Sequence, residues 1–202
     1  VYKRQGMPVV HSFGRFLPKP AVHVVGIDNR AAGQLAARTL VERGYKHIAM
    51  MAGPGTATST QDRLAGFQHE LKSHPEVKVS HSFARAYSFD AGRAEMSRLL
   101  QEDRAEAYIC GDDVLSIGAL SAAESAGLRV PEDVGFIGVN DMEMSRWQNI
   151  NLTTIKNPLA RIVETSLDLI DRMLETPDLP VEAHKIKAEL VERGTLRQPE
   201  TP

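Results

Sequence analysis

Residues 47–67, HIAMMAGPGTATSTQDRLAGF, decide the fold of this chain because they contain one complete strand, turn and helix. The apolar run 47–53 predicts a buried strand, and a turn rich in Gly, Pro and Thr follows it. Ser59 or Thr60 can start the helix. Its apolar face would carry Leu64, Phe67 and Leu71. A strand that leads through a short turn into a helix is the repeating unit of a mostly parallel sheet.

The same alternation continues on both sides of this stretch. Further strands are expected at 23–27, 78–87, 107–110, 134–139, 152–155 and 185–195. Helices are expected from Asp28 or Asn29 to Gly44, from Asp90, from Asp112 or Asp113 to Gly127, and from Asn157-Pro158 to Thr176. We therefore predict an α/β protein with parallel sheets flanked by helices.

Composition excludes several classes of protein. The 202 residues are 42% hydrophobic and 25% charged, which excludes disordered, collagen-like and disulfide-scaffold chains. Lys and Arg (24) nearly balance Asp and Glu (26), so this stretch offers no basic face for DNA. The single cysteine, Cys110, fits a reducing compartment. With neither a signal peptide nor an apolar run of about 20 residues, we expect a cytoplasmic location and no membrane partner.

Catalytic, cofactor and metal motifs find little support. The turn AGPGTATS (52–59) lacks the Gly-Lys-Ser/Thr ending of a phosphate loop and the third glycine of a dinucleotide fingerprint. No Gly-x-Ser-x-Gly elbow occurs, and no histidine stands at ligand spacing beside Asp112 and Asp113. These adjacent carboxylates keep open an α/β enzyme with acid–base or metal chemistry, although a helix cap is the stronger interpretation for Asp113. We predict no enzyme activity, no cofactor and no metal.

What remains is a set of side chains suited to binding, most of them in the loops that follow the strands. Arg63 offers a rigid donor fork, Asp112 accepts two hydrogen bonds, and Asn140 both donates and accepts. Flat apolar faces come from Phe13, Tyr87 and Trp147. Paired donors, acceptors and an aromatic face suit a sugar or another polyol. A surface ion pair is an equally good role for Arg63, and packing or a partner contact is a better one for Trp147.

Six blocks in this order resemble the effector-binding region of the lac-repressor/galactose-repressor family: LVERGYKHIAMMAGP (40–54), RLAGF (63–67), CGDDVLSIGAL (110–120), GLRVPEDVGFIGVND (127–141), LTTIKNP (152–158) and AELVERGT (188–195). The resemblance implies a two-lobed fold like the type I periplasmic-binding proteins, without the DNA-binding headpiece and the first part of the N-terminal lobe. Residues 1–43 and 157–178 would then form a partial N-terminal subdomain. Residues 44–156 and 179–198 would form the C-terminal one, with 199–202 as a tail.

The resemblance also implies roles for site residues. Arg63 matches the family's ligand-contacting arginine, and Tyr87 matches an aromatic residue that stacks on the effector. Asp112 stands where many members have Asn, and Asn140 stands where many have Asp, so the acid and the amide are exchanged. Phe13 matches a loop position near the cleft between the lobes.

Together these features predict the effector-sensing region of a transcriptional regulator. A sugar or related metabolite in the cleft would be coupled to operator DNA through an upstream headpiece, in a homodimer that uses loop 142–149 as a contact. A periplasmic sugar-binding protein of a transport system is the alternative. An upstream helix-turn-helix would identify the regulator, and an upstream signal peptide would identify the transport protein.

Overall fold

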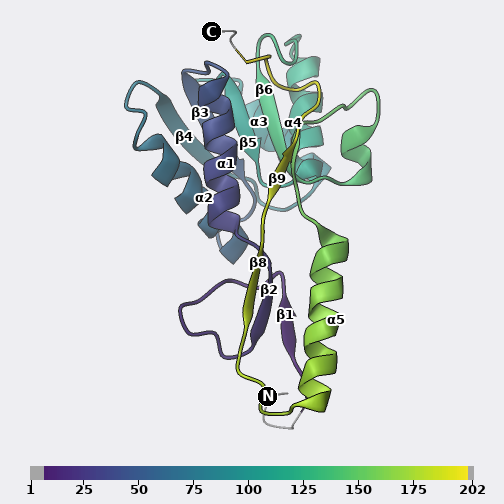
Figure 1. The fold of residues 1–202 in the computed structure, drawn as a ribbon. Helices are drawn as coiled ribbons and strands as arrows, with labels where there is room; N and C mark the ends of the chain where they lie inside the picture. Colours follow the sequence, from purple (N-terminus) through teal and green to yellow (C-terminus); the bar gives the residue numbers. More distant parts are fainter. Residues whose placement is uncertain (1–6, 200–202) are drawn as a thin grey trace. The chain divides into compact units, whose positions relative to one another are not determined.

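The computed structural model describes residues 7–199 and divides the chain into two compact units. The small unit is formed by residues up to 28 and by 158–188, and the large unit by 29–157 and the residues from 189 onward. Within residues 7–199 the small unit holds a three-stranded sheet and the large unit a six-stranded sheet (Figure 1). Residues 1–5, which fit no predicted element, and residues 200–202 of the predicted tail lie outside the described residues.

The small unit is a parallel sheet covered by one helix. Its strands stand in the order β1 (Val10–Ser12), β2 (His23–Ile27) and β8 (Ala183–Ile186). All of β2 is buried, as expected for a central parallel strand with an apolar sequence. Helix α5 (Leu159–Glu175) packs against β1 and β2.

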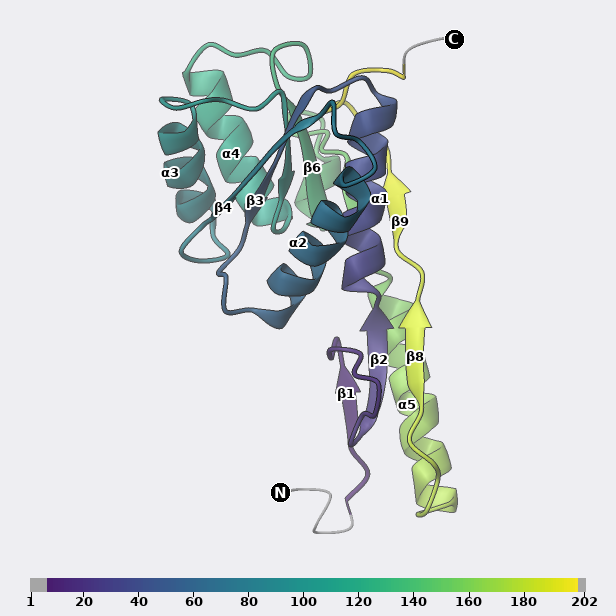
Figure 2. The ribbon, with the colours of Figure 1, turned by 90° about the vertical axis from the view of Figure 1, so that its left-hand side faces the viewer.

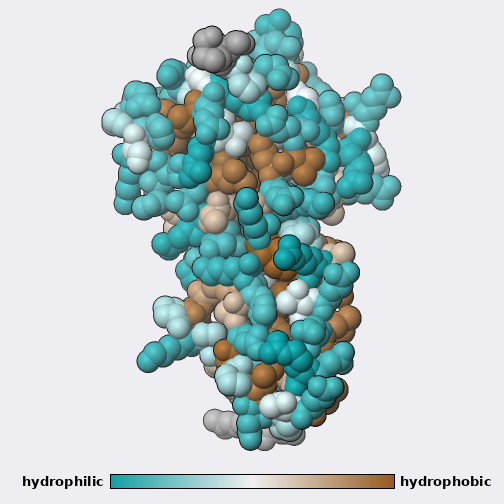
Figure 3. Space-filling view, viewed as in Figure 1, coloured by the Kyte–Doolittle hydropathy of each residue, from teal (hydrophilic) through white to brown (hydrophobic). Residues whose placement is uncertain are grey.

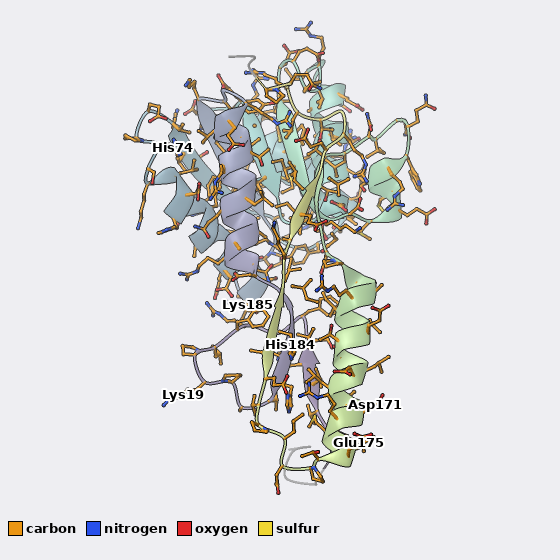
Figure 4. All side chains as sticks on the ribbon, viewed as in Figure 1. Lys19, His74, Asp171, Glu175, His184 and Lys185 are labelled. Atoms are coloured by element: carbon orange, nitrogen blue, oxygen red, sulfur yellow. The ribbon has the colours of Figure 1, made fainter. Side chains whose placement is uncertain are left out.

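Helix α5 has the most strongly amphipathic pattern in the sequence, but its apolar residues divide into two groups. The buried face carries Ile162, Ser166 and Leu169. The exposed stripe carries Leu159, Val163, Leu167 and Leu174. Figure 3 shows hydrophobic surface on the side of the molecule where α5 lies. Figure 4 labels Asp171 and Glu175 on the side of α5 that points away from β8. Within the described residues, α5 therefore presents apolar side chains that a soluble protein normally covers.

The large unit is a doubly wound sheet. Its elements are α1 (Asn29–Glu42), β3 (His47–Ala52), α2 (Thr58–Leu71), β4 (Lys78–Phe83), α3 (Phe89–Leu99), β5 (Ala107–Cys110), α4 (Asp113–Ser125), β6 (Gly135–Asn140), a 3-10 turn η2 (Glu143–Arg146), β7 (Thr154–Lys156) and β9 (Glu189–Val191). The strand order is β4-β3-β5-β6-β7-β9, parallel except for β9. Figure 2 shows α1 and α2 on one face of this sheet and α3 and α4 on the other. The predicted α/β class with parallel sheets is confirmed.

The predicted strands are largely correct, and two of them need correction. The strand expected at 78–87 ends at Phe83, because its ladder partner β3 ends at Ala52. The strand expected at 185–195 is two strands in different sheets: β8 pairs with β2, and β9 pairs antiparallel with β7. The chain passes from the small unit to the large one between these strands.

The unit boundaries differ from the predicted lobes for related reasons. The family resemblance implies that residues 29–43 belong to the first lobe, whereas α1 packs against α2 and belongs to the large unit. Residues 179–188 were expected in the second lobe, whereas β8 belongs to the small unit through its pairing with β2.

Among the described residues, no helix is long and apolar enough to cross a bilayer.

Glycines let the helices of the large unit touch backbone to backbone. A Cβ on Gly33 of α1 would lie 2.1 Å from the backbone carbonyl oxygen of Arg63 in α2. A Cβ on Gly66 of α2 would lie 1.9 Å from the backbone carbonyl oxygen of Arg30 in α1. On the other face, the same reciprocal contact joins α3 to α4 through Gly92 and Gly118. Because no side chain intervenes, each helix pair has a fixed separation.

Asp113 ties the start of α4 to the neighbouring strands. Its side chain is fully buried. One carboxylate oxygen accepts from the Thr154 hydroxyl at 2.5 Å, and the other accepts from the Met142 amide at 2.7 Å. Burial raises the pKa of Asp113 to about 6, and the carboxylates of Asp112 and Asp141 add to the shift.

Replacing Gly66 by Ala should destabilise the large unit. Alanine favours a helix by about 1 kcal/mol over glycine, but the added methyl meets a backbone carbonyl that cannot move aside, and overpacking of this kind costs about 1–3 kcal/mol. We expect a net loss of unfolding free energy in urea, followed by the fluorescence of the single tryptophan, Trp147. Gly55→Ala is the control, because its Cβ would only touch the Phe83 ring at 3.4 Å. Equal stability of the two variants would contradict the close approach.

The stability of the large unit should depend on pH through Asp113. Its pKa is 3.8 ordinarily and about 6 in the folded chain, so the folded state keeps a proton that the unfolded state releases between these values. The unfolding free energy should therefore fall as pH rises from about 4 to about 6, by on the order of 2–3 kcal/mol.

The difference between the native chain and Asp113→Asn isolates this contribution, since all other titrating groups are shared. Urea unfolding at several pH values measures it. A difference that stays constant between pH 4 and pH 6 would show that Asp113 is charged throughout this range.

Candidate functional site

The carboxyl ends of β3 and β5 form the point at which the winding of the large sheet reverses. From β3 the chain runs through α2 to β4 on one side, and from β5 it runs through α4 to β6 on the other. Ligands of open α/β sheets bind in the crevice at such a reversal. Gly53 and Gly111, the residues that follow β3 and β5, touch here: a Cβ on Gly111 would lie 2.4 Å from the Gly53 nitrogen.

Arg63 of α2 lies at this edge of the sheet and is 7% exposed. Its guanidinium donates to the Gly111 carbonyl at 3.0 Å and to the Asn29 side-chain oxygen at 3.2 Å. Its Nε is buried and has no hydrogen-bond partner among the described residues. Burial lowers the pKa of Arg63, while the Tyr87 hydroxyl and the Asp112 carboxylate partly offset that effect. This edge of the sheet therefore contains a desolvated positive charge with an unpaired donor. The burial of Arg63 excludes the alternative role of a surface ion pair.

Tyr87 lies against Gly53 at the same crevice. A Cβ on Gly53 would come within 2.2 Å of the tyrosine ring, so only glycine leaves room for it. The Tyr87 hydroxyl bonds the Thr60 hydroxyl at 2.7 Å, one turn before Arg63 on α2. With 38% of the residue exposed, part of the ring remains open to a ligand.

Asp112 caps helix α4, since its side chain accepts from the Leu115 amide at 2.8 Å. The sequence analysis favours Asp113 for the cap. The structure gives the cap to Asp112, because that residue has the extended backbone of a cap position and Asp113 is already helical. Burial raises the pKa of Asp112, and the Leu115 amide and the Arg63 charge partly counter the rise. Ser88 likewise caps α3 in place of the predicted Asp90.

Asn140 ends β6, the neighbour of β5, with a φ of 112°. Its side-chain oxygen accepts from the Asn157 amide at 3.5 Å, and its carbonyl accepts from the Asn157 backbone nitrogen at 3.4 Å. Arg63, Tyr87 and Asp112 are linked by the interactions above, and Asn140 stands at the next strand of the same edge.

The remaining aromatic candidates lie elsewhere. Phe13 follows β1 in the small unit with a φ of 63°, and its amide donates to the Val25 carbonyl at 2.7 Å. It is about half exposed and belongs to the small unit. Trp147 follows η2 and is more than half exposed. Its expected role as a packing residue or partner contact stays a prediction.

Sequence reasoning missed three polar contributors: Asn29, Thr60 and Asn157. Thr60 precedes Arg63 by one helical turn, a spacing that places both on one face of α2. Asn157 follows β7, at the same edge as Asn140. Asn29 was seen only as a helix start, and its contact with Arg63 has no signal in the sequence. Among residues 7–199, no three His, Cys, Asp or Glu side chains gather in a way that could hold a metal ion.

Comparison with known proteins agrees with this architecture. The model of the periplasmic binding protein-like domain family matches residues 37–196. The repressor PurR of Escherichia coli O1:K1 is 35% identical over 175 residues, which cover 84% of this chain and 51% of that protein. The chain thus spans about half the length of the curated relatives it matches.

Solved structures show the same fold. A LacI-family regulatory protein from Corynebacterium glutamicum is 28% identical with a TM-score of 0.83, over 93% of this chain and 72% of that one. A LacI-family regulator from Enterococcus faecium, solved with bound ribose, is 23% identical with a TM-score of 0.85, over 98% and 73%. The relatives are described as repressors and regulators of transcription, not enzymes. The chain belongs to the periplasmic binding protein-like domain family, as the effector-binding region of a LacI-family protein.

Proposed function

We propose that this chain senses a small polyhydroxylated metabolite, most simply a sugar, for a transcriptional regulator that binds operator DNA through an upstream headpiece. The observation that carries the proposal is Arg63, whose buried guanidinium keeps a free Nε donor at the winding reversal of the large sheet. A ligand hydroxyl or ring oxygen would satisfy that donor. The ribose-bound regulator of the same fold supports a sugar as the first ligand class to test.

Each site residue has a distinct role in this proposal. Arg63 donates to ligand oxygens, and Asp112 accepts from ligand hydroxyls with the oxygen lone pairs that the Leu115 amide leaves free. Asn140 does both, and the open part of the Tyr87 ring rests on the C–H face of the sugar. The resemblance predicts that the first lobe adds Phe13 and closes over the ligand, which would shift the population of two lobe arrangements.

A cytoplasmic homodimer is part of the same proposal. On the large unit, a cavity of about 240 Å³ is lined by Phe89, Ile117, Leu120, Ser121, Glu124, Asn149 and Ile150. The exposed Trp147 precedes it in the loop after η2. We propose that a second copy covers this partly apolar surface, near the loop 142–149 chosen from the sequence.

Transport by a periplasmic sugar-binding protein remains the alternative function. A transcriptional repressor is 35% identical over 84% of this chain, which favours the regulator. The gene sequence upstream of this stretch discriminates the two, because a helix-turn-helix belongs to one and a signal peptide to the other. An enzyme that uses Asp112 and Asp113 together is disfavoured, because both oxygens of the Asp113 carboxylate are held by the Met142 amide and the Thr154 hydroxyl.

The ligand should be found by thermal shift on the full-length protein with a panel of D-ribose, other aldoses and sugar alcohols. A ligand at one hundred times its dissociation constant adds about 2.7 kcal/mol to stability, a readily measured rise in melting temperature. We expect at least one sugar to raise it. No rise with any carbohydrate would contradict the proposed ligand class.

Arg63→Ala should weaken binding of the identified sugar by about 3 kcal/mol, roughly 150-fold, because a desolvated charged donor is lost. Titration calorimetry measures the change. Arg43→Ala is the matched control: Arg43 is also buried in the large unit, but it pairs with Glu192 and the Arg197 carbonyl. Comparable binding by the two variants would remove Arg63 from the site.

Asp112 variants separate the cap from ligand binding. Asparagine caps helices as well as aspartate does, whereas alanine costs about 1 kcal/mol. We therefore expect Asp112→Asn to keep the unfolding free energy and Asp112→Ala to lower it, while both weaken sugar binding. Urea unfolding and calorimetry on the same samples test this. Native affinity in Asp112→Asn would mean that the carboxylate serves only the cap.

A further inference from the structure

Asn140 and Asp141 form a corner in which two successive non-glycine residues have left-handed backbone, with φ of 112° and 55°. Asn and Asp enter this region more readily than other residues, yet it remains unfavourable. Such conformations persist where the surrounding structure determines them, and they concentrate at functional sites. The contacts that hold this corner are therefore the ones that fix where Asn140 stands.

Arg193, two residues beyond β9, makes the shortest side-chain contact to Asp141. The Ser145 hydroxyl and the Arg146 guanidinium also donate to this carboxylate, at 3.3 and 3.5 Å. The guanidinium of Arg193 donates to the Asp141 carboxylate at 2.5 Å, to the Leu152 carbonyl at 2.7 Å and to the Ser145 hydroxyl at 3.3 Å. Its own amide donates to the Thr153 hydroxyl at 2.9 Å. The side chains of Arg193 and Asp141 are 13% and 8% exposed, so water screens their ion pair weakly.

Asp113 holds the other side of the corner. It accepts from the Met142 amide, and it binds the Thr154 hydroxyl, which in turn accepts from the Asp141 amide at 3.4 Å. The Asp141 amide thus bonds Thr154 of β7, and the Met142 amide bonds Asp113 of α4. The Asp141 carboxylate accepts from Arg193, which follows β9. Arg193 contributes no atom to the Arg63 crevice itself, so its role is to position.

We propose that Arg193 is a positioning residue for the ligand site: it clamps Asp141 and so keeps Asn140 in its left-handed conformation at the carboxyl edge of the large sheet. The inference rests on the proposed function for the ligand, but the clamp can be tested without one. Arginine suits this position because its planar fork reaches a carboxylate, a carbonyl and a hydroxyl together, which lysine cannot do.

The first arm of the test measures amide hydrogen exchange by NMR on the full chain without ligand. In Arg193→Met, the amides of Met142 and Ser145 should exchange at least tenfold faster, while amides of β3 and β5 keep their protection. Arg193→Lys should fall between that variant and the native chain. The control is Arg197→Met, four residues further on, because Arg197 binds the Glu132 carbonyl and lies over the Tyr45 ring, remote from the corner.

The second arm measures D-ribose binding by calorimetry on the same variants. Arg193→Met should lose at least tenfold in affinity, and Arg197→Met should stay within twofold of the native chain. Unchanged exchange at Met142 in Arg193→Met overturns the clamp. If the Met142 and Ser145 amides exchange faster in Arg193→Met but the affinity for D-ribose is unchanged, Arg193 does not position the ligand site.

The two proposals fail in different ways. If the native chain ignores D-ribose, that result counts against ribose as the ligand, and the exchange arm still decides the clamp. If all amides of Arg193→Met exchange faster together, Arg193 is a general stabilising residue, and the positioning role is rejected.

Discussion

The guanidinium of Arg63 is almost completely buried at the carboxyl edge of the large sheet. The contacts at this edge depend on how that buried charge is satisfied. An isolated buried guanidinium is costly, so its donors must find oxygen atoms. Two of them do so, at the Gly111 carbonyl and the Asn29 side chain. The Tyr87 hydroxyl and the Asp112 carboxylate favour the charged form and so partly offset the effect of burial on the pKa of Arg63. The Nε of Arg63 has no hydrogen-bond partner among the described residues, and the proposed ligand site depends on this donor.

Local sequence patterns predict most of the fold because each one has a direct physical cause. The strand at 23–27 is buried throughout, and Gly44 and Gly127 adopt the positive φ expected of residues that end helices. The errors arise where tertiary pairing decides. Nothing between 185 and 195 marks the point at which one strand pairs with β2 and the next with β7. The cap of α4 similarly depends on which of two adjacent aspartates the backbone leaves extended.

The candidate site was predictable in its residue types and less so in its geometry. Tyr87 and Asp112 follow from their places after strands, and Arg63 follows from its donor fork and from the family resemblance; the structure links the three. The sequence could not predict that the Nε of Arg63 lacks a hydrogen-bond partner, or that Tyr87 packs against Gly53; only the structure shows both. Arg193 was invisible as a functional residue because it lies 52 residues from Asp141 along the chain and acts through it. Phe13 belongs to the other unit, so its part in the site remains a prediction.

The glycine contacts between α1 and α2 bear on how an event at Arg63 would be felt elsewhere. Interfaces made of side chains absorb small displacements by changing rotamers, whereas two backbones in direct contact have no such slack. Arg63 sits on α2 with its own carbonyl against Gly33 of α1, and α1 begins at Asn29, where the large unit takes over from the small one. A shift of α2 would therefore act directly on α1, which begins where the chain first enters the large unit.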